Sequence, residues 1–337
     1  MASVSKWELG QSYPDIALLP RLATLFDLTI DELLDYRPQL SMAEIREALD
    51  DLREAFQTNP FDKALAEARS LAHEYYACPE LLAQLASLLL NHSALAPTAE
   101  LAAEALDATV TLCQRTATLD APVATLRLAR SLEAAVELLR HNPARTKELL
   151  GDAADPEVGE FLLMADADMA LGDLRHARQT LQTAVYQRLI LIVNALTSLA
   201  TTTGGDPERI RLTHQRTLAV MDAFDLDTLF LNAVAVHLSF AILFARAGAD
   251  DEAIACCERY LKVAKSLSFP LEMTGDDFFD ELDAWFTRSG VSASILPAEQ
   301  VTRSRIVDGV RCEPAFAHLT ADGRFERILR ELEVTFR

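Results

Sequence analysis

The sequence predicts an all-α fold, and three observations support this prediction. From Leu40 onward, Ala, Leu, Glu and Arg dominate and apolar residues recur at helical spacing, whereas the alternation typical of strands is almost absent. Ser41 and Glu44 form the Ser-x-x-Glu pattern of a helix start. Gly172 and Gly248 each separate two helical patterns. We therefore expect helices joined by turns, with no sheet of consequence.

Composition and charge restrict the class of protein. The 337 residues suffice for two or three domains, and half of them are apolar, yet no uninterrupted apolar run reaches the length of a membrane span. No secretion signal opens the chain, and the five cysteines are scattered without Cys-x-x-Cys spacing. We expect a soluble, cytoplasmic protein without a cofactor or a bound metal. The net charge of −20 argues against long-range attraction to nucleic acid.

The first forty residues read as short helices separated by turns. A helix from about Ala2 to Leu9 has an apolar side that contains Val4 and Trp7, and Gly10 ends it. A second helix is expected from Pro14 to about Phe26. Thr29 and Glu32 then form a capping box for a third helix.

From Ser3 to Tyr36, this stretch resembles the second half of a lambda-repressor-like (XRE/Cro family) helix-turn-helix domain. The matching segments are VSKWE, a glycine, a Pro-Asp pair and LLPRLATLFDLTIDELL. The resemblance implies that the VSKWE helix is the recognition helix, with Trp7 in the core. It also implies the following DNA contacts: Met1, Ala2 and Lys6 to bases, and Ser3, Ser5, Gln11 and Ser12 to the backbone.

The resemblance departs from the family pattern in one respect. The family's domain places two helices before the recognition helix, whereas Met1 already lies within it. We therefore expect residues 1–40 to be an N-terminally truncated domain that binds duplex DNA poorly without the missing helices. Between Met1 and Ser41 there are three basic and six acidic residues, a local charge of 3 − 6 = −3. The alternative is an ordinary helical hairpin with chance similarity.

Residues 41–269 are expected to form a helical array. Successive helices are predicted over residues 41–57, 62–76, from Pro79, over 99–115 and over 121–140. FLLMADADMALGDLRHARQTLQTA and HLSFAILFARAGADDEAIACCERY each place small residues at helix crossings, an arrangement that resembles a tetratricopeptide (TPR) repeat. A further helical pair lies between them. The alternative is a helical bundle without repeats.

Residues 270–337 are expected to form a C-terminal helical cap. An acidic-aromatic helix, TGDDFFDELDAWF, precedes three short helices. The apolar face expected to cover the end of the array consists of Phe316, Leu319, Phe325, Ile328 and Leu332.

Two clusters allow both a functional and a structural interpretation. Cys256 and Cys257 could form a redox sensor, but their apolar helical surroundings favour small core residues. The second cluster could hold a metal ion, but its spacing fits no calcium loop, which favours a solvated helix start. It consists of Asp276, Asp277, Asp280 and Glu281.

Two functions remain open from the sequence. The order of segments resembles bacterial XRE-type regulators with TPR-like C-terminal regions, which implies transcriptional regulation, a homodimer and a peptide or protein effector. The alternative is an interaction module that binds a peptide or protein but not DNA. No metalloprotease, phosphate-loop or serine-hydrolase motif is present, so an enzyme is not expected.

Overall fold

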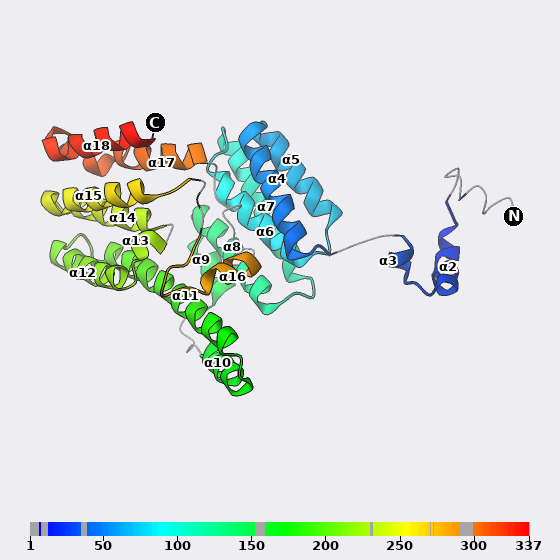
Figure 1. Cartoon of the computed structure of the whole chain (residues 1–337). Coiled ribbons are helices and arrows are strands. Elements are labelled where there is room, and N and C mark those ends of the chain that lie inside the picture. Colours follow the sequence, from blue (N-terminus) through cyan, green and yellow to red (C-terminus); the bar gives the residue numbers. More distant parts are fainter. Residues whose placement is uncertain are drawn as a thin grey trace. The chain divides into compact units, whose positions relative to one another are not determined.

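The computed structural model describes residue 7 and residues 13–34, 39–151, 159–229, 232–269, 271, 273–289 and 299–336. Within these ranges the backbone forms helices and turns and contains no strand, which confirms the predicted all-α class (Figure 1). The chain divides into two compact units, Met1–Gly151 and Asp152–Arg337. This division falls inside the segment predicted to be one array. The predicted boundaries after residues 40 and 269 stay predictions.

The amino-terminal segment contains η1 (Ile16–Leu18), α2 (Leu19–Phe26) and α3 (Ile30–Leu33). The single helix predicted from Pro14 is thus divided into a 3₁₀ turn and an α-helix. Pro20 explains the division, because it cannot donate a backbone hydrogen bond and is tolerated best in a first helical turn. The predicted capping box is confirmed, since the Glu32 carboxylate accepts from the Thr29 backbone N–H at 2.7 Å.

The rest of the first unit is a helical bundle around α6 (Pro79–Ser93). This helix is surrounded because its leucines occupy several faces; Leu81, Leu82, Leu85 and Leu88 are completely buried. Five helices accompany it: α4 (Met42–Thr58), α5 (Phe61–Glu74), α7 (Ala99–Ala117), α8 (Val123–Leu139) and α9 (Pro143–Leu150). The capping box predicted at Ser41 and Glu44 is present at the start of α4.

The second unit contains two helical hairpins, with one long and one short helix between them in the chain (Figure 1). Gly172, at φ 84°, joins α10 (Glu160–Leu171) to α11 (Leu174–Thr201), and Gly248, at φ 70°, terminates the helix before α15 (Asp250–Ser266). Both turns were predicted. Between α11 and α15 lie α12 (Pro207–Ala223), α13 (Leu226–Leu229) and α14 (Ala233–Arg246).

Helix α11 differs from the prediction by its length. Two separate helices were expected around Ala184, but the chain continues as one helix of 28 residues because neither glycine nor proline interrupts it. By length and composition alone α11 could cross a membrane, contrary to the sequence-based expectation that no segment could. One such helix is weak evidence, because the test uses length and composition alone. Only 28% of the apolar window is buried, so α11 is not a mostly buried core helix either.

The carboxy-terminal elements are α16 (Leu282–Ser289), α17 (Glu299–Arg311), η3 (Pro314–Ala321) and α18 (Gly323–Phe336). The five residues predicted for the cap are all buried, and α18 and η3 pack on α15 and α14. Part of the predicted acidic-aromatic helix is a turn, because Asp276 accepts backbone hydrogen bonds from Phe278 and Phe279 before α16 begins.

Candidate functional site

The residues predicted to contact DNA cannot be assigned positions. Residues 1–6 and 8–12 lie outside the described ranges. They include all seven residues predicted to contact DNA: Met1, Ala2, Ser3, Ser5, Lys6, Gln11 and Ser12. Trp7, the predicted core residue, is helical and half-buried. The DNA-contact set therefore stays a prediction.

The segment that follows them, η1 to α3, exposes apolar side chains. Among its described residues only Ala23 is buried. The exposed apolar side chains are Tyr13, Ile16, Leu25, Phe26, Leu28, Ile30 and Leu34. Three short helical elements cannot enclose a core of their own, so these side chains require a covering element.

A partly buried polar cluster, which we call the histidine cluster, lies among α12, α13, α14 and α15 of the second unit. The His237 ring is completely buried, and its Nε2 lies 2.7 Å from Asp227 Oδ1. The other carboxylate oxygen of Asp227 accepts two hydrogen bonds from Arg259, at 2.9 and 3.1 Å. Arg259 also pairs with Asp222. These contacts tie α15 to α12 and α13, and α14 to α13.

The electrostatics of this cluster keep Asp227 ionised. Burial acts to raise the pKa of Asp227, but the hydrogen bonds and charges of His237 and Arg259 outweigh it and lower the pKa below its usual value. Burial acts to lower the pKa of Arg259, whereas its hydrogen bonds to Asp222 and Asp227 raise it. Within the described part of the chain, Nδ1 of His237 is buried without a hydrogen-bond partner.

A cysteine–histidine pair adjoins the cluster. His214 Nε2 lies 3.6 Å from Cys256 Sγ, and the His214 ring packs on Phe240 and Phe244. Burial, aided by the charges of His237 and Arg259, lowers the pKa of His214 to about 4. Burial chiefly raises the pKa of Cys256 to about 12. Both groups are therefore neutral near pH 7, whereas a nucleophilic cysteine needs a thiolate.

Sequence reasoning did not find this arrangement. The histidines lie singly along the chain, and the cluster members come from four helices. The prediction that Cys256 and Cys257 fill the core is confirmed, since both are buried, and burial chiefly raises the pKa of Cys257 to about 12. In the sequence, Asp227 precedes His237 by ten residues. Side chains ten residues apart are not neighbours on a helix, so this spacing does not predict their contact.

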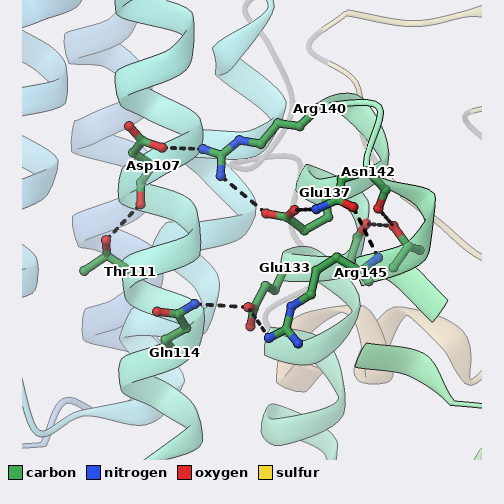
Figure 2. A network of polar contacts seen from close by, with 10 residues as sticks. Asp107, Thr111, Gln114, Glu133, Glu137, Arg140, Asn142 and Arg145 are labelled. Carbon is green, nitrogen blue, oxygen red and sulfur yellow. Dashed lines mark hydrogen bonds and ion pairs between the residues drawn. The ribbon is translucent and has the colours of Figure 1, made fainter. Parts of the chain in front are cut away.

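A second polar network joins α7, α8 and α9 of the first unit (Figure 2). Glu133, which is 8% exposed, accepts a hydrogen bond from Gln114 at 3.1 Å and lies 3.7 Å from Arg145. Arg140 at the end of α8 pairs with Asp107 of α7 and with Glu137 of its own helix. These polar groups are satisfied by one another, so the network connects three helices instead of presenting a ligand site.

The acidic cluster near α16 also has internal partners. Asp280 pairs with Arg178 and Glu281 with Arg175, so both carboxylates connect this turn to α11. Both residues directly precede α16, as the predicted helix start requires, and Asp280 is solvated at 47% exposure, whereas Glu281 at 13% is not. The local sequence did not reveal that α11 supplies a cation to each of them. No group of three or more potential metal ligands occurs among the residues that the structure describes.

Comparison with protein-family models, curated proteins and solved structures finds no match to this chain.

Proposed function

We propose that the chain is a DNA-binding transcriptional regulator of the XRE type. Residues 1–40 would form a partial helix-turn-helix domain, and the TPR-like helical region would sense a peptide or protein effector or mediate homodimerisation in the cytoplasm. We expect the printed residues alone to bind DNA weakly, because residues 1–40 do not include the two helices that brace the recognition helix in the resembled family.

The observation that carries the proposal is the combination found in η1 to α3. Its turns are specified by side chains: Asp15 accepts from the Ala17 backbone, and Thr29 and Glu32 close a capping box. Its apolar residues nevertheless point outward, as Leu25 and Phe26 do at 74% and 61% exposure. A segment with defined turns and an uncovered apolar surface is what a fragment of a helical domain would show.

The test is a gel-shift titration at low salt on the upstream region of the chain's own gene. We compare the printed chain with a form that carries the two amphipathic helices the resembled family places before the recognition helix. Sequence-specific binding by the extended form, weakened by Lys6→Ala, is the expected result. The absence of specific binding by either form would overturn the proposal.

The second candidate is a peptide-binding or protein-binding helical module that does not bind DNA. The net charge of −20 favours it, because acidic surfaces repel duplex DNA and attract basic segments. A thermal-shift screen with basic peptides distinguishes it from the first: stabilisation by a peptide, together with no DNA binding by either form, is expected only for the interaction module.

A further inference from the structure

The outer side of α11 carries a stripe of apolar residues that the second unit leaves largely uncovered. Leu174, Leu181, Val185, Ile192 and Leu199 follow one another at intervals of seven, four, seven and seven residues. This spacing places them along one side of the helix, at the period by which two helices pack against each other. Leu181 is half-buried and the other four are exposed, by 37% to 67%. At 1.5 Å per residue the stripe is about 38 Å long.

The stripe is distinct from the side of α11 that faces the core. Tyr186, Leu189 and Val193 are buried in the core of the second unit, and the Tyr186 hydroxyl donates to the backbone oxygen of Leu229 at 3.0 Å. Helix α11 therefore has one apolar side that its own unit buries and a second that it does not. An amphipathic surface helix needs only one such side.

Helix α10 extends this uncovered surface. Only Ala165 is buried among its described residues, and apolar residues occur around most of its circumference. Leu163 and Leu171 are 67% and 85% exposed although Ala165, between them, packs inward. A helix that is apolar nearly all round is expected to be covered on more than one side.

The two helices together expose a large amount of apolar surface. Ten large apolar side chains on α10 and α11 are each 37% to 85% exposed. Summed around both helices they present on the order of 1,000 Å² of apolar surface. This area is not a single patch, because Leu191 lies about 100° around α11 from the stripe and the α10 residues occur on several sides of that helix. A standard interface buries about 800 Å² on each partner.

We propose that this face of α10 and α11 is the homodimer interface, and that its occupant is the same face of a second copy. The proposal rests on the homodimer included in the proposed function and assigns its location. A two-fold axis lets one surface cover the same surface of a second copy, and a helix with a heptad-spaced apolar stripe is suited to pairing with its copy. The opposite, carboxy-terminal end of the unit is already covered by α17, η3 and α18.

The charges disfavour a lipid surface as the occupant. Residues 160–174 contain Glu160, Asp166, Asp168 and Asp173 but no lysine or arginine. Helices that lie on membranes usually present basic residues beside the apolar ones, because cytoplasmic lipid surfaces are anionic. Arg175 and Arg178, the next cations, are paired with Glu281 and Asp280.

The experiment is sedimentation equilibrium of the full chain over a micromolar concentration series. The wild-type chain is expected to sediment at twice the 37.1 kDa of one chain. Leu171→Glu and Ile192→Glu are each expected to weaken dimerisation at least tenfold, because an unpaired carboxylate would be buried in an apolar interface. Val334→Glu is the matched control, since Val334 on α18 is 82% exposed and outside the face.

Helix content measured by circular dichroism establishes that each variant is folded. If a glutamate variant does not fold, Ile192→Ala is used, and a smaller but measurable weakening is expected. A wild-type monomer across the series would overturn the inference, and so would variants that dimerise like the control. Co-sedimentation of a monomeric wild type with phosphatidylcholine–phosphatidylserine vesicles, lost in the variants, would assign the face to lipid instead.

The proposed DNA-binding function and the proposed dimer interface can be disproved independently of each other. Normal dimerisation that depends on α10 and α11, without specific DNA binding by either form of the chain, would overturn the proposed function and leave the interface in place. Specific DNA binding by a dimer that Ile192→Glu does not weaken would overturn the interface alone.

Discussion

Nε2 of His237 on α14 lies 2.7 Å from Oδ1 of Asp227 on α13, and the histidine ring is completely buried. The carboxylate of Asp227 also binds the guanidinium of Arg259. One anion therefore satisfies a buried ring and a partly buried cation, which makes Asp227 the central group of the histidine cluster. Removal of an anion shared in this way takes an acceptor from two polar groups at once, although Arg259 keeps its pair with Asp222.

We expect Asp227→Ala to destabilise the second unit by about 2–4 kcal/mol, because Arg259 and His237 lose their shared acceptor in a partly buried site. Urea unfolding followed by circular dichroism measures the change. Asp222→Asn is the matched control: Asp222 also pairs with Arg259, but its side chain is 57% exposed, so the loss should be below about 1 kcal/mol. Equal losses in the two variants would contradict the central role of Asp227.

The depressed pKa of His214 predicts a loss of stability in mild acid. The folded state holds the pKa of His214 at about 4, below its ordinary value of 6.5, so the unfolded chain binds this proton first as the pH falls. The free energy of unfolding should therefore decrease as the pH falls from about 6.5 to about 4. The maximum contribution from this residue is on the order of 3 kcal/mol.

His214→Phe should remove this part of the pH dependence, because a phenyl ring can still pack on Phe240 and Phe244 without titrating. The measurement is the urea midpoint of wild type and variant at pH 7, 6, 5 and 4. Plotted against pH, the urea midpoints of the two proteins should run parallel near neutral pH. Below about pH 6.5 the midpoint of the variant should fall less steeply than that of the wild type. Parallel curves down to pH 4 would show that His214 does not titrate in this way.

The cysteines should differ sharply in reactivity. Cys312 is exposed, whereas Cys78, Cys113, Cys256 and Cys257 are buried. Burial chiefly raises the pKa of Cys113, as it does for the adjacent pair, to about 12. A thiol-specific chromogenic reagent should therefore modify about one thiol per folded chain and all of them after unfolding. Cys312→Ser should abolish the fast phase; rapid modification that survives this substitution would restore the redox interpretation of Cys256 and Cys257.

The sequence predicted the elements that depend on neighbouring residues and missed those that depend on distant ones. The capping boxes at Thr29 and Ser41 and the turn at Gly172 were predictable, because each is specified within a few residues. The histidine cluster was not, because Asp227, His237 and Arg259 meet only after α13, α14 and α15 have packed together. The uncovered side of α11 was also missed, because apolar periodicity identifies a face without showing whether anything covers it.

The last prediction concerns DNA binding by the printed chain. A recognition helix gains specificity from side chains worth about 1–3 kcal/mol each, provided that phosphate contacts from neighbouring elements fix its register. Residues 1–41 carry three basic and six acidic residues. The excess of acidic side chains repels the DNA phosphates, which offsets much of the binding free energy that basic side chains gain by releasing counterions. The apolar side chains that η1 to α3 exposes, such as Phe26 at 61%, also indicate that the segment is not braced.

We therefore expect weak binding or none in a low-salt gel shift with the printed chain, and tighter binding once two bracing helices are supplied. The dissociation constant of the extended form should rise with salt, because its affinity would depend on phosphate contacts. Lys6→Ala should weaken specific binding by the extended form, while Lys262→Ala, a lysine of α15 outside the segment, should not. Tight, specific binding by the printed chain would contradict this prediction, since the recognition helix would then position itself without the bracing helices of the resembled family.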